Sequence, residues 1–199
     1  MSKASKIVLI IFIVIDLCYV GFFVIAGANP FMFTSEKEIY QMGVDELSIG
    51  IKDEVNKRGH IEKAIKYFEM AKKRGYNERD LYVRLHESYQ QLGDRNKEEE
   101  VLTKALELFP KDKEFLLYRG LSRLQQKKYP LAQTDFNQII TIDTTSKDTS
   151  EYLDDAFYNK GAITYKQGDT TKAAIDFKIA QGLTTDTLKK YDVYLKTLK

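Results

Sequence analysis

The side chains that most often carry chemistry in proteins are few in this chain and widely scattered. His60 and His86 are the only histidines, and neither has the spacing of a zinc protease or lies beside a nucleophile motif. Cys18 is the only cysteine, which excludes an intramolecular disulfide and a cysteine metal cluster. These residues therefore predict no catalytic centre, no bound metal and no cofactor.

Two groups of acidic residues are the remaining candidates for a metal site. Asp143, Asp148 and Glu151 lie close together, but the spacing and the glycine of a calcium loop are absent. The run Glu98–Glu100 is typical of a solvated helix start. The chain carries 31 basic and 29 acidic residues, and it lacks the basic stripe with interleaved aromatic residues that would predict a nucleic-acid partner.

The elements that position these residues follow a helical pattern that returns every 34 residues, with one longer interval of 41 before the last copy. The large apolar residues of this pattern, called the repeat core positions, are Phe68, Leu102, Phe136 and Phe177. Four places earlier lie Ala64, Glu98, Ala132 and Ala173, and three places later lie Ala71, Ala105, Ile139 and Ala180. Nine places earlier, at the expected turn, lie Gly59, Gly93, Lys127 and Gly168. A period of this length predicts stacked helical hairpins, each of which buries its apolar face against a neighbour.

The pattern resembles the tetratricopeptide repeat. The fourth copy shows the likeness best, because residues 156–161 and 165–169 read like the first helix and turn of that family. The second copy carries Tyr82, Leu85, Tyr89, Gly93, Leu102, Ala105, Leu106 and Pro110, and the third carries Leu116, Gly120, Tyr129, Ala132 and Phe136. The resemblance implies an all-α fold, a right-handed superhelical array of about four hairpins closed by a C-terminal capping helix.

The domain boundaries follow from this register. The four hairpins are expected at 45–78, 79–112, 113–153 and 154–187, with an extended loop inserted between residues 141 and 154. Residues 29–44 are expected to form a linker and a short helix, which a capping box of Ser35 and Glu38 begins. Residues 188–199 are expected to form the capping helix, because Leu188, Tyr191, Leu195 and Leu198 recur at helical spacing.

Some positions depart from the family pattern. The residues expected at the small contact between the helices of a hairpin are Lys52, His86, Gly120 and Gly161. Arg119, Arg123, Lys160 and Thr164 stand where the family usually has larger apolar groups. We therefore expect looser or shifted packing of some first helices.

The amino-terminal run from Ile7 to Ala28 predicts a single transmembrane helix. As a helix it would be roughly 33 Å long, and the hydrocarbon core of a bilayer is about 30 Å thick. Lys3 and Lys6 precede the run and only Lys37 follows it within twenty residues. The positive-inside rule then puts the repeats on the non-cytoplasmic side, which is the periplasm in a Gram-negative bacterium.

Two alternatives to this anchor stay open. Residues 26–28 have the small-x-small form of a signal-peptidase site, so the run could be removed after Ala28. Cys18 could be a lipoprotein processing site, although Leu17 is large for the residue before such a cysteine and the apolar run continues past it.

Asp16 is the one acidic residue inside the apolar run. A carboxylate at this depth costs about 2.5–3.5 kcal/mol on translocon scales, which makes it a candidate functional residue. It could bond a polar group on a partner transmembrane helix, or the surrounding apolar residues could simply tolerate it.

The resemblance also implies where a ligand would bind, because the first helices of such hairpins line a concave groove. The corresponding positions in the second, third and fourth copies are Asp80, Val83, Glu87, Gln90, Glu114, Leu117, Leu121, Leu124, Asp155, Tyr158, Ala162 and Tyr165, and Asn159 matches a family asparagine that often bonds peptide backbone. From these we predict a partner-binding set of Val83, Glu87, Leu117, Leu121, Leu124, Tyr158, Asn159, Ala162 and Tyr165.

Such a groove is apolar and aromatic with an acidic edge, and suits a peptide with apolar anchors and basic residues. An alternative is that Leu117, Leu121 and Leu124 pack internally in a rotated repeat.

The sequence thus predicts a membrane-anchored repeat protein that acts as a protein–protein interaction adaptor or assembly factor. Two other functions stay open. One is a cleaved module that is secreted or periplasmic, and the other is a structural subunit held in a membrane complex through its transmembrane helix.

Overall fold

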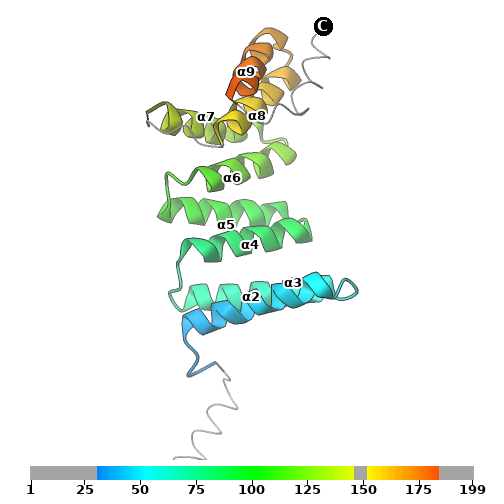
Figure 1. The fold of residues 1–199 in the computed structure, drawn as a ribbon, viewed down its shortest axis with the longest axis vertical. Helices are drawn as coiled ribbons and strands as arrows, with labels where there is room; N and C mark the ends of the chain where they lie inside the picture. Colours follow the sequence, from blue (N-terminus) through cyan, green and yellow to red (C-terminus); the bar gives the residue numbers. More distant parts are fainter. Residues whose placement is uncertain (1–30, 146–151, 184–199) are drawn as a thin grey trace, which may run out of the picture. The chain divides into compact units, whose positions relative to one another are not determined.

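The computed structural model describes residues 31–145 and 152–183, and within these ranges the chain forms eight α-helices and no strand (Figure 1). The helices divide into two compact units at residues 77 and 78. The first unit holds α2 and α3, and the second holds α4 to α9. The predicted all-α fold is confirmed for the described residues.

The first unit is a hairpin of α2 (Glu36–Lys52) and α3 (Lys57–Lys73). The predicted capping box begins α2: the Glu38 amide donates to Ser35 Oγ at 3.2 Å, and the Ser35 amide donates to Glu38 Oε2 at 2.8 Å. From there α2 continues as one helix through residues 44 and 45, where the linker was expected to meet the first repeat. The hairpin closes on the ring of Phe68, which is fully buried against Tyr40.

Two expectations for this hairpin are wrong. Gly43, and not Lys52, makes the small contact, because a Cβ at Gly43 would lie 2.5 Å from Phe68 Cε1. Gly59 lies inside α3 and not in the turn, which residues 53–56 form. Both shifts have one cause: α2 extends nine residues past Gly43 and α3 begins eleven residues before Phe68, compared with five past Gly120 and seven before Phe136. Each helix of the first hairpin therefore carries about one extra turn next to the connection.

The second unit is a succession of three hairpins (Figure 1). Its helices are α4 (Arg79–Leu92), α5 (Arg95–Leu108), α6 (Lys113–Gln125), α7 (Tyr129–Thr145), α8 (Leu153–Lys166) and α9 (Thr170–Leu183). Each of these helices packs against the next in the chain, and α6 also contacts α8. The first helices of the third and fourth hairpins therefore lie side by side.

The turns inside these hairpins are built as the sequence predicts. Gly93 has φ +75° and Gly168 has φ +92°, a left-handed conformation that glycine adopts without strain. Asp94 then caps α5, because its carboxylate accepts a hydrogen bond from the Lys97 amide at 3.0 Å. Lys127 fills the same turn position in the third hairpin with φ +59°.

The repeat core positions are confirmed as the centre of the packing. Phe68, Leu102, Phe136 and Phe177 are all 0% exposed, and so are Ala64, Ala71, Ala105, Ala132, Ile139, Ala173 and Ala180. Glu98 stands among these small residues and is itself 1% exposed.

The insertion before the fourth hairpin is shorter than expected. α7 continues as a helix to Thr145, so residues 141–145 are not part of an extended loop. Asp143 anchors this helical end, since its Oδ1 accepts a hydrogen bond from Lys113 Nζ at 2.5 Å and its side chain is fully buried. This buried ion pair engages the carboxylate of Asp143, one of the three acidic residues considered above for a calcium loop.

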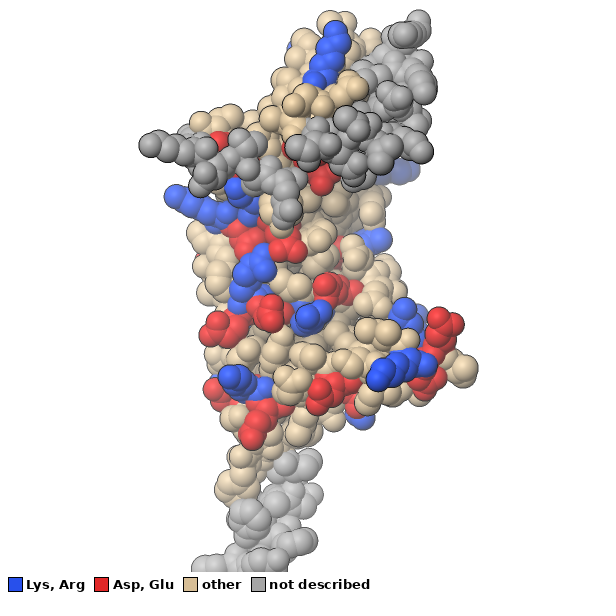
Figure 2. Space-filling view, in the orientation of Figure 1, with Lys and Arg blue, Asp and Glu red and all other residues tan. Residues whose placement is uncertain are grey.

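Several predictions concern residues outside the described ranges: the transmembrane helix at 7–28 with Asp16, and the capping helix at 188–199. Among the helices described, none is long and apolar enough to cross a bilayer. On the face drawn in Figure 2, acidic and basic side chains are interspersed along both units.

Candidate functional site

The predicted partner-binding residues lie on the first helices α4, α6 and α8. Val83 and Glu87 on α4 are half-buried, and so are Leu121 and Leu124 on α6. Leu117 is 5% exposed, so its side chain belongs to the packing between helices more than to a surface. The alternative of internal packing thus applies to Leu117, while Leu121 and Leu124 keep part of their surface in solvent.

On α8, the two tyrosines of the predicted set lie over the core of the fourth hairpin. Tyr158 and Tyr165 both pack against a buried cluster of Ala162, Ala173 and Phe177. The ring centroids of Tyr158 and Phe177 are 5.6 Å apart. Each tyrosine keeps part of its ring exposed, an arrangement that offers a fixed aromatic surface at a low cost in side-chain entropy.

Asn159 is already engaged within its own helix. Its Nδ2 donates to the Asp155 carbonyl oxygen at 2.8 Å, and the residue is 8% exposed. This bond fixes the orientation of the side-chain amide. A ligand would therefore meet an asparagine whose rotamer is set in advance.

Sequence reasoning missed Tyr118, a half-buried residue of α6 whose phenol lies within the electrostatic influence of acids from three first helices. Burial raises the pKa of the Tyr118 phenol, and the carboxylates of Glu114, Glu87 and Asp155 raise it further. Carboxylates from α6, α4 and α8 therefore all act on one phenol. The signal in the sequence was the acidic edge at positions 87, 114 and 155, but nothing in the sequence showed that all three acids act on one phenol.

Two of these acidic residues, Glu87 and Glu114, pair with arginines of α4. Arg84 Nη1 donates to Glu87 Oε2 at 3.0 Å. Arg79 pairs with Glu114 and donates to Asp112 Oδ2 at 2.6 Å, and these two carboxylates raise the pKa of its guanidinium. The Arg79 guanidinium also lies 5.0 Å from the centroid of the Phe115 ring. Glu87 and Glu114 are thus already paired with arginines of α4, which balance their negative charge.

Beneath Tyr118 lies His86, which occupies the position of a glycine in the later hairpins. The two rings stack with centroids 4.4 Å apart. His86 is 2% exposed, and its Nδ1 lies 3.5 Å from Glu98 Oε1 without forming a hydrogen bond. Its partners in this hairpin fit the predicted packing role.

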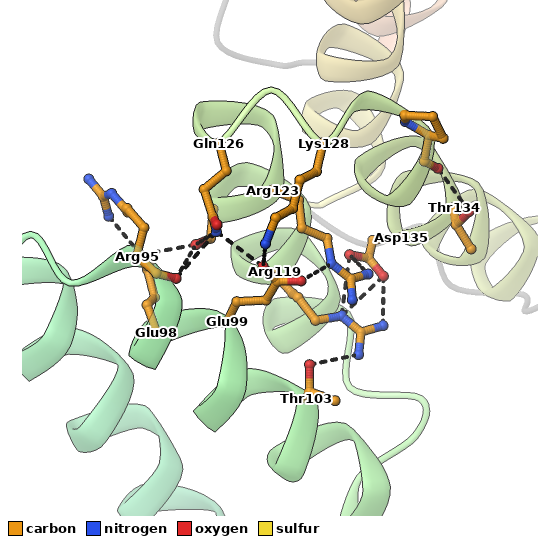
Figure 3. Close-up of polar contacts among 12 residues, drawn as sticks. Arg95, Glu98, Glu99, Thr103, Arg119, Arg123, Gln126, Lys128, Thr134 and Asp135 are labelled. Atoms are coloured by element: carbon orange, nitrogen blue, oxygen red, sulfur yellow. Dashed lines mark hydrogen bonds and ion pairs between the residues drawn. The ribbon is translucent and has the colours of Figure 1, made fainter.

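The charged residues that depart from the family pattern form a polar network between α5, α6 and α7 (Figure 3). Arg119 Nη2 donates to Asp135 Oδ1 at 2.7 Å, and Arg123 Nη1 donates to Asp135 Oδ2 at 2.8 Å. Arg123 Nε also donates to Glu99 Oε1 at 2.8 Å, which links the third hairpin to α5. In the fourth hairpin Lys160 Nζ donates to Asp176 Oδ1 at 2.8 Å. The expected looser packing at these positions is thus replaced by buried ion pairs.

The network also sets the ionisation of two glutamates on α5. Burial raises the pKa of Glu99, but Lys128 and Arg123 outweigh it and lower the pKa below its ordinary value. Burial likewise raises the pKa of Glu98, and His86 and Arg95 together bring it below the ordinary value. Both carboxylates are thus held in their charged form inside the structure.

A cleft of about 370 Å³ opens between α7, α8 and α9. It is lined by Gln133, Lys160, Thr164, Gln167, Asp169, Lys172, Ile175 and Asp176. None of the nine predicted residues lines it. Its lining mixes both signs of charge, and Lys160 and Asp176 neutralise each other within it.

His60, the other histidine, belongs to the first unit. Its Nδ1 lies 2.8 Å from Glu46 Oε2, and its Nε2 lies 3.5 Å from Asp53 Oδ2. The imidazole thus joins the end of α2 to the start of α3. No group of three or more metal-ligating side chains comes together in the part of the chain that the structure describes.

Comparison with known proteins points to one family. Residues 80–112 match the model of the tetratricopeptide repeat family. No curated protein shows a significant match to the sequence.

Solved structures share the fold at low sequence identity. YrrB, described as a TPR protein with an unusual peptide-binding site, is 22% identical with a TM-score of 0.57, covering 69% of this chain and 66% of its own. MamA 41-end from Desulfovibrio magneticus RS-1 is 17% identical with a TM-score of 0.55, covering 79% of this chain and 93% of its own. The Arabidopsis OM64 TPR domain is 19% identical with a TM-score of 0.53, covering 60% of this chain and 93% of its own. The chain therefore has the tetratricopeptide repeat fold, and its α4–α5 hairpin carries a repeat that the family model itself matches.

Proposed function

We propose that this chain is a membrane-anchored adaptor or assembly factor that holds a peptide segment of a partner protein against the first helices α4, α6 and α8. The observation that carries the proposal is the contact between α6 and α8, two successive first helices that both carry half-buried apolar side chains. A surface shared by successive first helices is what peptide recognition by a repeat array requires.

The chemistry of this surface defines the ligand. Leu121, Leu124, Tyr158 and Tyr165 are half-buried apolar side chains on α6 and α8, and these two helices are in contact. Apolar anchors of a peptide would pack on them. The fold of YrrB supports the proposal, because that protein is described as having a peptide-binding site.

The proposed location rests on the sequence alone. The 22 residues from Ile7 to Ala28 are long enough to anchor the chain as a single span, and the lysines before them favour repeats on the non-cytoplasmic side. In a Gram-negative bacterium this side is the periplasm. A cleaved periplasmic or secreted module would use the same binding surface without the anchor.

A second function, as a subunit of a membrane complex, is favoured by Asp16 alone. A carboxylate inside an apolar run is stabilised by a polar group on a neighbouring helix. Asp16→Leu should then release the chain from such a complex while the repeats stay folded, and co-sedimentation of the variant with its partners would detect this.

The binding surface is tested by crosslinking in native membranes, with a photoreactive amino acid at Leu124, followed by identification of the captured protein. Leu121→Ser and Tyr158→Ala should then each weaken co-purification of that protein by roughly thirty-fold, as a hot-spot loss of about 2 kcal/mol requires. Leu131→Ser is the matched control, because Leu131 is 48% exposed and lies on the second helix α7.

Circular dichroism and hydrogen exchange must show that each variant remains folded, because Tyr158 also packs on Phe177. Lys160 is unsuitable as a control, since it pairs with the buried Asp176. Undiminished capture by both folded variants would place the binding surface elsewhere. The anchor is tested separately: a mature amino terminus at Asn29, or release by carbonate washing, would contradict it.

A further inference from the structure

The cleft between α7, α8 and α9 lies where the preceding pair of hairpins holds the polar network of Figure 3. The repeat register relates the two places residue by residue, with 34 residues from α5 to α7 and 41 residues from α6 and α7 to α8 and α9. One part of the chain thus shows what fills the space that another part leaves open. In this register the cleft residues Gln133, Lys160, Thr164 and Asp176 correspond to the network residues Glu99, Arg119, Arg123 and Asp135.

In the network one buried carboxylate accepts hydrogen bonds from two guanidinium groups. Asp135 is 0% exposed, and its Oδ1 accepts from Arg119 at 2.7 Å while its Oδ2 accepts from Arg123 at 2.8 Å. Arg123 also donates through its Nε to Glu99 Oε1 at 2.8 Å. The guanidinium of Arg123 therefore bridges an aspartate of α7 and a glutamate of α5, and joins the second hairpin to the third.

The cleft has the equivalent aspartate without this bridge. The side chain of Asp176 is 8% exposed, and its Oδ1 accepts a hydrogen bond from Lys160 Nζ at 2.8 Å. Thr164 is too short to replace an arginine, and its hydroxyl donates to the Lys160 carbonyl oxygen at 3.0 Å. Asp176 Oδ2 and the side-chain amides of Gln133 and Gln167 form no hydrogen bond with another described residue. A nearly buried carboxylate oxygen is costly to leave without a donor.

The cleft also lacks one cation beside this aspartate. The exchange of Arg123 for Thr164 removes a positive charge, and Lys172 does not replace it, because Lys172 pairs with Asp169 at 3.0 Å. A group that enters the cleft is therefore favoured if it is positively charged and carries several donors. An arginine guanidinium has five N–H donors in a planar fork that matches a carboxylate, whereas a lysine ammonium acts as a point charge.

We propose that this cleft binds the guanidinium group of an arginine side chain that a partner protein supplies. The guest would donate to Asp176 Oδ2 and to the side-chain oxygen of Gln133, the counterpart of Glu99. The cleft volume of about 370 Å³ is near the lower end of the range for small-ligand sites, about 300–1,000 Å³, and suits one side chain. Ile175, which is 55% exposed at the cleft wall, offers an apolar surface to the methylene stem of the arginine.

The source of this arginine lies outside the chain. All arginines of the sequence lie between Arg58 and Arg123, so the segments outside the described ranges carry none, and no described arginine lines the cleft. Both lysines of the lining are already paired, so neither is placed to bind the α-carboxylate of free arginine. The cleft shares no residue with the predicted partner-binding set on α4, α6 and α8, and the two surfaces can be tested separately.

A nuclear magnetic resonance titration of the full chain tests the proposal. The probe is N-acetyl-arginine amide, which presents an arginine side chain without charges on its backbone, and the glutamines of the protein are labelled with nitrogen-15. The side-chain amides of Gln133 and Gln167 should shift and saturate, whereas that of Gln138, which lies outside the cleft, should not. N-acetyl-lysine amide should bind about ten-fold more weakly, because an ammonium has no planar fork to bridge two acceptors. The neutral citrulline analogue should not bind.

Two variants copy the network into the cleft. Thr164→Arg supplies the missing guanidinium from the chain itself and should weaken binding of the probe by at least about ten-fold. Gln133→Glu restores the counterpart of Glu99 and should tighten binding by about three-fold, with Gln167 as the reporter, since a carboxylate binds a guanidinium more strongly than an amide does. Gln181→Arg is the matched control, because it adds an arginine at an exposed position of α9 outside the cleft and should leave the affinity unchanged.

Circular dichroism confirms the fold of each variant, and Gln133→Glu keeps the test decisive if Thr164→Arg fails to fold. The proposal would be overturned by the absence of a saturable shift in the native chain, by equal binding of the arginine and citrulline probes, or by unchanged affinity in every cleft variant that folds. Tighter binding of free L-arginine than of the capped probe would assign the cleft to the amino acid and would overturn its assignment to a side chain of a protein.

Discussion

The second hairpin, α4–α5, and the third, α6–α7, fill the same positions with opposite chemistry. The third hairpin packs Gly120 against Phe136 and pairs Arg119 with Asp135 beside them. At the equivalent positions the second hairpin has His86, Leu102, Leu85 and Val101. The second hairpin therefore has a histidine where the third has Gly120, and apolar residues where the third has the ion pair of Arg119 and Asp135.

This exchange shows that the repeat specifies volume and contact more strongly than polarity. In the second hairpin the smaller Leu102 is accompanied by the large imidazole of His86, whose neighbour Glu98 stands where the third hairpin has Ala132. In the third hairpin the ring of Phe136 fills the space that a glycine leaves. Each solution works as a set, because a change of one member leaves either a clash or an uncompensated charge.

The largest effect expected is that of Asp135→Ala, which should lower the free energy of unfolding by about 3 kcal/mol. The change leaves two buried arginine charges without their shared carboxylate. Arg123 would keep its ion pair with Glu99, whereas Arg119 would keep only the contact of its Nη1 with Thr103 Oγ1 at 3.5 Å. Urea unfolding followed by far-ultraviolet circular dichroism measures the loss.

Two matched variants sharpen this result. Asp176→Ala should cost less, because its partner Lys160 has a side chain 26% exposed and can reach water, compared with 14% for Arg119. The double change Arg119→Leu and Asp135→Val copies Leu85 and Val101, and should recover most of the lost stability. A loss below about 1 kcal/mol in Asp135→Ala would mean that the arginines reach solvent easily and that the ion pairs do not hold the hairpin.

The architecture was predictable because it depends on spacing. The positions of Phe68, Leu102, Phe136 and Phe177, and the turns at Gly93 and Gly168, follow from periodicity and from the conformational freedom of glycine. The first hairpin was misplaced because α2 and α3 are each 17 residues long, compared with 14 for α4 and α5, which moves its turn and contact glycine out of the 34-residue register. Periodicity predicts the positions of helices well when all copies have the same length, and it misplaces the helices of a copy whose length differs.

The binding surface was less accessible to sequence reasoning. The positions on first helices could be carried over from the family, and the acidic edge was visible at Glu87, Glu114 and Asp155. Their common effect on the pKa of Tyr118 depends on how α4, α6 and α8 are placed, which no local pattern encodes. The partners of Arg119 and Arg123 were hidden for the same reason, since Asp135 and Glu99 come from different helices.

A smaller effect is expected from Gly120→Ala, which should destabilise the protein by about 2 kcal/mol. The new Cβ would lie 2.6 Å from Phe136 Cε1, so the ring must leave its place. Combined with Phe136→Leu, which copies Leu102 of the second hairpin, the alanine should cost almost nothing beyond Phe136→Leu alone. A double-mutant cycle from urea unfolding measures this coupling. If the two changes in the free energy of unfolding simply add, then the side-chain volumes at the two contact positions do not compensate each other between the hairpins.

The smallest effect concerns pH, and it tests the polar side of the second hairpin. The pKa of Glu98 is lowered in the folded state, since His86 and Arg95 outweigh its burial. A carboxyl whose folded pKa lies below its unfolded value near 4.3 stabilises the fold fully above that value, and the contribution is lost as the pH falls through the folded pKa.

Glu98→Gln removes this titration and retains the shape of the side chain. The free energy of unfolding should then fall less steeply below about pH 4.5 than in the native chain, and a series of urea titrations between pH 7 and 3 measures the slope. An unchanged slope in Glu98→Gln would mean that the acid dependence arises elsewhere, for which Glu99, with its pKa lowered by Lys128 and Arg123 despite burial, is the next residue to test.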